Sequence, residues 1–309
     1  MLSAAIDVGS NTIRLLIGEG KADGLSRIYS DRSITRLAQG FSQRKILRQK
    51  NIDDSISALK KFSDIIFRHG VRHIKAVGTS ALRDAENSKD FLELAANATG
   101  INIEVISGEK EAELTAKGVM AGFRNNAGEF FITDIGGGST EWIVYDNAKP
   151  FSSLPHGTLP LGVVNLYERF IRTDPPSEKD ISSLMNEADS IFKKNFPEFP
   201  DLKSIIGTGG TITTLAAIDI GLGEYDPEKV NMHKMSLYKL HMIRDRLVSM
   251  TLDERKNIKG LEPGRADLII PGILLTIKLV EFLNLREIIV SDFGLLEALI
   301  LEIEDEKVV

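Results

Sequence analysis

The chain contains two copies of one strand–turn–strand pattern, at residues 5–17 and 133–144. Each copy has an apolar run, an aspartate near its end, a turn of small polar residues and a second apolar run. Such a repeat predicts a molecule with two similar halves, each built around a hairpin. The residues that coincide when the copies are aligned are Asp7 with Asp134, Gly9 with Gly136, and Thr12 with Ser139.

The two turns carry residue types that are suited to binding phosphate. Glycine lets the backbone approach a ligand closely, successive N–H groups of a tight turn form an anion site, and hydroxyl groups donate further hydrogen bonds. Ordinary hairpin turns favour the same residues, but their repetition favours binding, and we expect both hairpins to face a shared cleft. The candidate phosphate-binding residues are Ser10, Asn11, Thr12, Gly136, Gly137, Gly138 and Ser139.

A third glycine-rich loop, at residues 207–211, lies between an apolar strand and an apolar helix. N–H groups at a helix N-terminus attract anions, so Gly209, Gly210 and Thr211 are further phosphate-binding candidates. A simple strand-to-helix turn is the alternative. Neither this loop nor the triple glycine fits G-x-G-x-x-G or the P-loop pattern, so those two nucleotide-binding motifs are not predicted.

Charged residues near these loops allow two interpretations each. An aspartate at a strand end, such as Asp7 or Asp134, can hold Mg²⁺, which is usually bound by one or two carboxylates plus waters and phosphates. The acids at 109–113 open a predicted helix, where the helix dipole alone would favour them. Arg83 could bind phosphate through its planar guanidinium, or it could be an ordinary surface residue near a helix start.

Composition limits the class of protein. The 309 residues carry a net charge of −6 and no cysteine, which excludes disulfides and thiolate chemistry and fits a cytoplasmic protein. No basic tail suggests nucleic-acid binding, and no apolar stretch is long enough to cross a membrane. The five histidines show no metal-binding spacing. We therefore expect a cytoplasmic protein without a membrane or nucleic-acid partner.

Strand-like and helix-like stretches alternate along the chain, which predicts an α/β architecture with mixed sheets covered by helices. Turn residues after Phe123 place the expected boundary between an N-terminal domain, 1–123, and a C-terminal domain, 124–309, whose last helix could pack back on the first domain. Among the expected elements are strands at 2–8, 25–29, 33–37, 73–78 and 287–291, and helices at 52–66, 88–97 (with Ser88 as N-cap and Gly100 beyond its end), 109–123 and 268–283.

Eight short motifs in this order resemble the exopolyphosphatase/guanosine pentaphosphate phosphatase (Ppx/GppA) family, and the resemblance covers nearly the whole chain. It implies two ribonuclease-H-like domains of the actin, sugar kinase and heat-shock ATPase superfold, with an interdomain cleft. The motifs lie at residues 6–12, 78–85, 106–112, 134–141, 160–164, 207–211, 264–267 and 291–295.

The resemblance also implies roles for individual residues. Glu111 matches the family's general base, which activates water for in-line attack on a terminal phosphoryl group, and Asp134 is the second catalytic candidate. Asp7, Asp134 and Glu141 match acids that handle Mg²⁺, and Arg83 matches an arginine near the substrate phosphates. The implied protein is a cytoplasmic hydrolase of phosphoanhydride bonds, of the short two-domain form, with a place in the stringent response. By analogy, its apolar C-terminal helices would form a homodimer.

Two departures from the family bear on the choice of substrate. Glu113 stands where many members have arginine, and Leu296 stands where many have another arginine. Both remove positive charge that could guide long polyphosphate. Inorganic polyphosphate and guanosine pentaphosphate therefore both remain candidate substrates. The alternatives are a guanosine tetra- or pentaphosphate-binding sensor without turnover, and a kinase of the same superfold.

Overall fold

The computed structural model describes residues 2–21, 24–41, 44–123, 129–199 and 202–308. The chain forms two compact units, which we describe separately: unit 1 is Met1–Arg124 with Phe293–Val309, and unit 2 is Asn125–Asp292. The expected domain boundary, after Phe123, adjoins residues 124–128, which lie outside the described residues.

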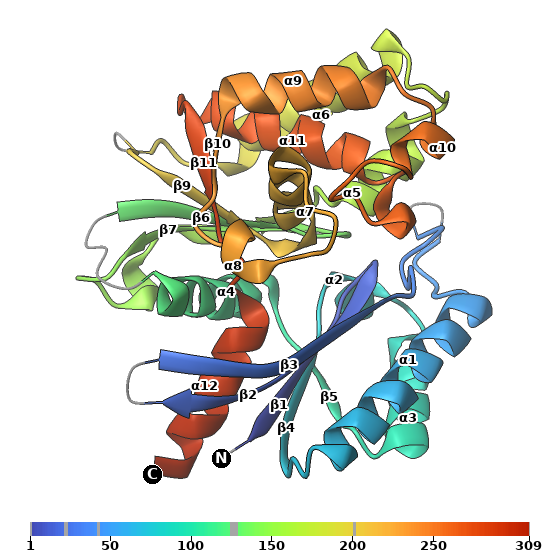
Figure 1. Ribbon diagram of the computed structural model, residues 1–309, viewed down its shortest axis with the longest axis vertical. Helices are drawn as coiled ribbons and strands as arrows, with labels where there is room; N and C mark the ends of the chain where they lie inside the picture. Colours follow the sequence, from blue (N-terminus) through green and yellow to red (C-terminus); the bar gives the residue numbers. More distant parts are fainter. Residues whose placement is uncertain (1, 22–23, 42–43, 124–128, 200–201, 309) are drawn as a thin grey trace. The chain divides into compact units, whose positions relative to one another are not determined.

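Unit 1 is built on a five-stranded sheet of order β3-β2-β1-β4-β5 (Figure 1). The first three strands pair antiparallel, whereas β1, β4 and β5 run parallel. The strands are β1 Ser3–Val8, β2 Thr12–Lys21, β3 Gly24–Ile34, β4 His73–Gly78 and β5 Ile103–Val105, and the helices are α1 Gln49–Arg68, α2 Ser80–Asp84, α3 Ser88–Thr99, α4 Gly108–Gly122 and α12 Leu295–Val308.

Helices cover both faces of this sheet. The apolar residues of α1 recur at three- and four-residue spacing, as in Ile52, Ile56 and Leu59, and they are buried in one cluster with alternate side chains of β1 and β2. The remaining side chains of β1 and β2, such as Ala5 and Leu16, pack in a second cluster with α4 and α12. The last helix of the chain is therefore part of the same core as its first strand (Figure 1).

Unit 2 is built on a six-stranded sheet of order β10-β11-β9-β6-β7-β8. Its helix α11 is almost entirely buried and packs against α5, α6, α7 and α9 (Figure 1). The strands are β6 Glu129–Ile135, β7 Thr140–Asp146, β8 His156–Leu159, β9 Ile205–Thr208, β10 Lys234–Ser236 and β11 Glu287–Val290, and the helices are α5 Val163–Phe170, α6 Glu178–Asn195, α7 Gly209–Ile220, α8 Pro227–Val230, α9 Leu237–Val248, α10 Leu252–Arg255 and α11 Ile269–Phe282.

The two sheets share one topology. In unit 2, β8, β7 and β6 pair antiparallel and β6, β9 and β11 run parallel, which repeats β3, β2, β1, β4 and β5 of unit 1. The antiparallel strand β10 is an addition at one edge. This doubled arrangement confirms the predicted α/β class with mixed sheets and two similar halves.

Local predictions were mostly confirmed, with two corrections. Ser88 is the first residue of α3 and the N-cap is Asn87, whereas Gly100 ends the helix with a φ of 72°, as expected of a residue that needs the left-handed region. The strand expected at 33–37 is the end of β3, which runs without interruption to Ile34. The backbone leaves the ladder there because Thr35 and Arg36 hydrogen-bond to the first turn instead.

Candidate active site

The first turn, between β1 and β2, is held in one conformation by its own backbone. The N–H of Gly9 donates to the carbonyl of Thr12 over 3.1 Å, and a Cβ on Gly9 would lie only 2.9 Å from that same oxygen. The side chains of Ser10, Asn11 and Thr12 are all buried. Among the described residues, the Oδ1 atom of Asn11 is buried without a hydrogen-bond partner, so the turn also holds an unsatisfied acceptor.

The carbonyls of the first turn are bound from behind by the segment that follows β3. Ala38 donates its N–H to the carbonyl of Ser10, and Thr35 and Arg36 donate theirs to the carbonyl of Asn11, over 2.8 to 3.1 Å. In a planar trans peptide the C=O of one residue and the N–H of the next point in opposite directions. The N–H groups of Asn11 and Thr12 are therefore directed away from this segment, as an anion site requires.

Asp7 is paired across the hairpin with Arg14. The two residues stand directly opposite in the ladder, and the Arg14 guanidinium donates to Oδ2 of Asp7 through Nε at 2.9 Å and Nη2 at 2.7 Å. The other oxygen of Asp7, Oδ1, is buried without a hydrogen-bond partner. One carboxylate oxygen is thus already paired with a cation, and the other accepts no hydrogen bond from the described residues.

The proposed base lies at the same edge of the unit 1 sheet as the first turn. The parallel strands β1, β4 and β5 end together, because Thr79 donates its N–H to Val8 and Ile106 donates its N–H to Gly78. The loops that follow these three strands carry the first turn, Arg83 on α2 and Glu111 on α4, respectively. This edge collects every predicted site residue of unit 1.

Arg83 binds Glu111 directly, which sequence reasoning missed. Its Nη1 donates to Oε2 of Glu111 over 3.0 Å and to the carbonyl of Ile106 over 2.9 Å. Glu111 is only 7% exposed. A buried carboxylate needs such a partner, because an unpaired buried charge is costly, and the contact fixes where the carboxylate points. The two candidates are separated by 28 residues, so no local pattern could have paired them.

The triple-glycine turn of unit 2 repeats the first turn in geometry. The N–H of Gly136 donates to the carbonyl of Ser139 over 3.0 Å, as Gly9 does to Thr12. Its carbonyls are also bound from behind, here by the first turn of α5: Val163 donates its N–H to Gly136, Val164 its N–H to Gly137, and Asn165 its Nδ2 to Gly138, over 2.9 to 3.1 Å. By the same peptide geometry, the N–H groups of the three residues that follow Gly136 point away from α5.

Two acids stand together beside this turn. Asp134 and Glu141 are directly opposite in the β6–β7 ladder, so their side chains share one face of the sheet, and both are buried. Glu141 accepts a hydrogen bond at Oε1 from the hydroxyl of Thr158. The Asp134 carboxylate also contacts the third loop, because a Cβ on Gly209 would fall 2.0 Å from its Oδ1.

The third loop contacts an arginine, Arg265, that the predicted site residues did not include. The Arg265 guanidinium lies against Gly210, where a Cβ would fall 2.0 Å from Nη1. The motif at 264–267 was the signal that could have found it. Thr211 donates its hydroxyl proton to the carbonyl of Ile135 over 2.9 Å, which leaves its backbone N–H as the group that this residue can offer to an anion.

The two residues that depart from the family pattern, Glu113 and Leu296, both interact with neighbouring residues of unit 1. Glu113 pairs with Lys117 at 2.7 Å and with Lys110 at 3.5 Å, and these lysines lower the pKa of its carboxyl against the opposing effect of burial. Leu296 is buried in the apolar cluster beneath α4 and α12. The added negative charge is therefore compensated, and the missing arginine is replaced by core packing.

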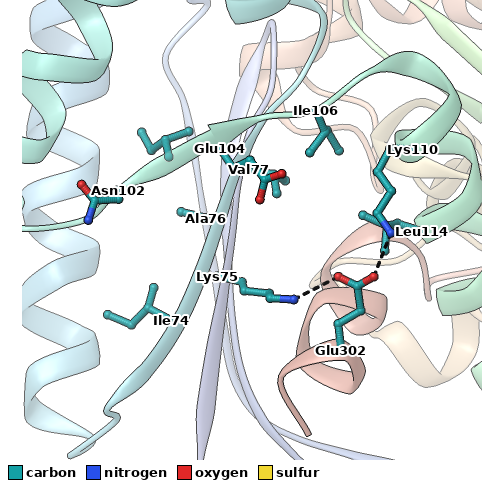
Figure 2. Close-up of a pocket in the computed structure, with 11 residues that line it drawn as sticks. Ile74, Lys75, Ala76, Val77, Asn102, Glu104, Ile106, Lys110, Leu114 and Glu302 are labelled. Carbon is teal, nitrogen blue, oxygen red and sulfur yellow. Dashed lines mark hydrogen bonds and ion pairs between the residues drawn. The ribbon is translucent and has the colours of Figure 1, made fainter. Parts of the chain in front are cut away.

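A surface pocket of about 320 Å³ lies beside β4 and β5, lined in part by α4 and α12 (Figure 2). Glu302 bridges its two lysines, accepting from Lys75 at 3.1 Å and from Lys110 at 3.0 Å. Because both ammonium groups are already paired with carboxylates, this pocket does not provide the unpaired positive charge that a polyanion needs.

The residues fit a Mg²⁺ ion more readily in unit 2 than in unit 1. Within the part of the chain that the structure describes, no three His, Cys, Asp or Glu side chains gather as a ready-made metal site. Mg²⁺ does not need one, since one or two carboxylates plus phosphates and waters suffice. Asp134 and Glu141 supply such a pair, whereas Asp7 has a single oxygen left for a metal.

No helix among the described residues is long and apolar enough to cross a membrane.

Two curated relatives resemble the chain along most of its length. Exopolyphosphatase 2 from Mycobacterium tuberculosis is 30% identical, covering 97% of this chain and 98% of the relative. A guanosine-5'-triphosphate,3'-diphosphate pyrophosphatase from Vibrio parahaemolyticus is 29% identical, covering 99% of this chain and 60% of the relative.

A bifunctional 3-dehydroquinate synthase/phosphatase from Fusobacterium nucleatum is 31% identical over 99% of this chain, which spans about half (47%) of that relative. Among solved structures, the Aquifex aeolicus Ppx/GppA family member superposes with a TM-score of 0.81 at 32% identity, covering 99% of this chain and 98% of that one. The model of the Ppx/GppA phosphatase family matches residues 16–307. The chain therefore belongs to the Ppx/GppA phosphatase family.

Proposed function

We propose that this protein is a phosphohydrolase that releases the terminal phosphate of inorganic polyphosphate, guanosine pentaphosphate or both, by in-line attack of water. The observation that carries the proposal is the buried Glu111 carboxylate, held by Arg83 at the sheet edge where the first phosphate turn lies. The relatives named exopolyphosphatase and guanosine-5'-triphosphate,3'-diphosphate pyrophosphatase support the two substrates.

Substrate binding falls to backbone N–H groups. In each turn the carbonyls are occupied from behind, so the N–H groups of Asn11 and Thr12, and those of residues 137–139, are directed to the other side. They would donate to phosphate oxygens, with further donors from the hydroxyls of Ser10 and Ser139 and from Gly209, Gly210 and Arg265 at the third loop. Positioning and charge neutralisation of this kind do most of the work in phosphoryl transfer.

Glu111 would act as the general base. Its carboxylate takes a proton from water as the water oxygen attacks the terminal phosphorus, and the bond from phosphorus to the bridging oxygen breaks. Arg83 keeps the carboxylate in position and is itself a candidate to bind phosphate. A positioned base typically contributes about 10²–10⁴ in rate.

Mg²⁺ is the proposed metal ion, with Asp134 and Glu141 as its ligands and Asp7 as a further candidate. When bound, the ion would neutralise negative charge on the phosphate oxygens. The carboxylates of Asp134 and Glu141 lie on one face of the sheet beside the triple-glycine turn, which supports their proposed role as metal ligands.

The test is release of inorganic phosphate from long polyphosphate, tripolyphosphate and guanosine pentaphosphate, with Mg²⁺ and with a chelator. We expect release without any acceptor, dependence on Mg²⁺, and a fall in kcat of about 10²–10⁴ for Glu111→Gln with the fold retained. Wild-type turnover in Glu111→Gln would remove this residue from the mechanism. Tight binding of guanosine pentaphosphate without release would favour a sensor, and transfer that requires a hydroxyl acceptor would favour a kinase.

We propose that the protein acts in the cytoplasm as a homodimer, and that it belongs to the stringent response if guanosine pentaphosphate is hydrolysed. Light scattering of the purified protein tests the dimer, and a monomer at micromolar concentration would contradict it.

A further inference from the structure

In each unit an asparagine side chain lies behind a proposed phosphate turn, on the side that faces away from the directed N–H groups. In unit 2, Asn165 donates Nδ2 to the carbonyl of Gly138 over 3.1 Å. In unit 1, Asn51 on α1 is 5% exposed and donates Nδ2 to the carbonyls of Thr35 and Arg36, over 3.2 and 2.7 Å. No motif of the sequence singled out either residue.

Asn165 acts on the triple-glycine turn by direct contact. It follows the two residues of α5 whose N–H groups bind the carbonyls of Gly136 and Gly137. Its own side chain binds the next carbonyl, that of Gly138. The C=O of Gly138 and the N–H of Ser139 belong to one planar peptide. Fixing the carbonyl therefore fixes the direction in which Ser139 presents its N–H. Three consecutive residues with glycine's freedom would otherwise have many conformations to lose on binding.

Asn51 acts on the first turn through one intermediate step. Thr35 and Arg36 both donate their N–H groups to the carbonyl of Asn11, and Asn51 holds these two residues by their own carbonyls. Arg36 has a φ of 53°, a left-handed conformation that is uncommon for a non-glycine residue. The Asn51 amide helps to hold it there.

We infer that Asn165 and Asn51 are positioning residues for phosphate binding: each keeps the carbonyl side of one turn satisfied, so that the N–H side is preorganised for the polyanion. This inference rests on the proposed function for its choice of ligand. Preorganisation reduces the conformational cost of binding, so its loss appears in KM and affinity while the chemical step, which depends on Glu111, is unchanged.

The test replaces each amide by a side chain of similar size without a donor. For Asn165→Leu we expect the KM for tripolyphosphate to rise about fivefold, the effect of one lost hydrogen bond, with kcat within about twofold of wild type. Asn165→Gln, which keeps the amide, should recover most of the affinity. The matched control is Asn195→Leu, because Asn195 also donates Nδ2 to a backbone carbonyl, that of Ile191, but on the exposed surface of its own helix.

Calorimetric titration with tripolyphosphate in a Glu111→Gln background separates binding from turnover. Weaker binding of tripolyphosphate by Asn165→Leu in this background supports the inference. This holds even if the wild-type chain hydrolyses nothing. In that case the proposed function fails and the inference stands. Wild-type KM and affinity in a folded Asn165→Leu variant would overturn the role of Asn165. Asn51→Leu is expected to behave in the same way. If it does not fold, Asn51→Ala, which removes the amide without adding bulk, is measured in its place, and wild-type affinity in whichever of the two variants folds would overturn the role of Asn51.

Discussion

At the scale of single residues, the site is shaped by positions where no side chain fits. Gly209 has a φ of 83°, and a Cβ there would lie 2.0 Å from Oδ1 of Asp134. The loop therefore approaches the carboxylate as closely as a backbone can. Arg265 makes the same kind of approach at Gly210. Two adjacent glycines thus have different charged neighbours, one acidic and one basic.

Gly209→Ala should lower activity by more than its loss of folding stability can explain. The new Cβ must displace the Asp134 carboxylate, and we expect kcat/KM to fall at least tenfold and the Mg²⁺ requirement to rise. Gly221→Ala is the matched control, because Gly221 lies at the other end of α7 with a φ of 75° but has open space around it. Strain from positive φ, roughly 1 kcal/mol, is common to both variants. Equal activity of the two would show that the contact with Asp134 is unimportant.

Whether these contacts could be predicted depends on how far apart the partners are in sequence. The hairpin turns, their glycines and the strand-end aspartates form continuous stretches, so they could be identified from the sequence. The Arg83–Glu111 pair and the Arg265–Gly210 contact join residues from separate loops. The first arises because β4 and β5 are neighbouring parallel strands, and the second joins the segment before α11 to the start of α7, so no short window of sequence contains either contact.

At the scale of elements, the critical contact in unit 1 is the crossing of α4 and α12. Gly118 of α4 meets the backbone of Gly294 at the start of α12, and a Cβ on Gly118 would lie 1.7 Å from the Gly294 carbonyl oxygen. The phenyl ring of Phe293 lies against Gly122 in the same way. Because α4 begins with the turn that carries Glu111, its packing against α12 helps to place the proposed base.

Gly118→Ala should destabilise the protein although alanine favours helices by about 1 kcal/mol over glycine. The clash is with backbone, which cannot rotate away, so we expect a net loss of about 1–3 kcal/mol, as for other overpacked sites. Thermal or urea unfolding measures it. Gly223→Ala, where a Cβ would meet open space, serves as control. An unchanged melting temperature for Gly118→Ala would contradict the close crossing.

The ion pairs of Glu302 on α12 with Lys75 on β4 and Lys110 on α4 should make the stability of the protein depend on pH in the acid range. Burial alone would raise the pKa of Glu302, but its contacts with Lys110 and Lys75 lower it below the usual value of about 4.3 (Figure 2). A depressed folded-state pKa gives stability that is present above the unfolded-state value and is lost as pH falls through the folded-state value.

Glu302→Gln should therefore lower the melting temperature at pH 7 and reduce its dependence on pH below about 4.3. Glu306→Gln is the control, because Glu306 lies one turn further along α12 and binds Lys75 at 2.7 Å but not Lys110. We expect a smaller effect from this exposed pair. Equal effects of both substitutions would mean that the link to α4 adds nothing.

Predictions for elements succeeded where a pattern was long. The buried helix expected at 268–283 is α11, Ile269–Phe282, and the amphipathic helix expected at 52–66 lies within α1. Short elements such as β8 and β10, of four and three residues, were missed. They are strands because neighbouring strands pair with them, and their own residues carry little of that information.

At the scale of the whole molecule, the chain builds unit 1 from both of its ends and unit 2 from its middle. A fragment of residues 125–292 has a complete apolar core of its own, so it should fold alone with a cooperative thermal transition. Residues 1–124 lack α12, whose Leu295, Leu299 and Ile300 are part of the core beside β1 and β2. We expect this fragment to aggregate or to lack cooperative unfolding by circular dichroism, and a sharp transition would contradict this.

The duplicated hairpins also differ in charge at one pair of matching positions. The residue opposite the strand-end aspartate is Arg14 in unit 1 and Glu141 in unit 2, although the backbones around them correspond. Exchanging the two hairpins would preserve the backbone hairpin in each unit but would reverse the sign of the charge opposite the aspartate. The two copies have thus become non-interchangeable parts: one sets a guanidinium across from its strand-end acid, and the other sets a second carboxylate there.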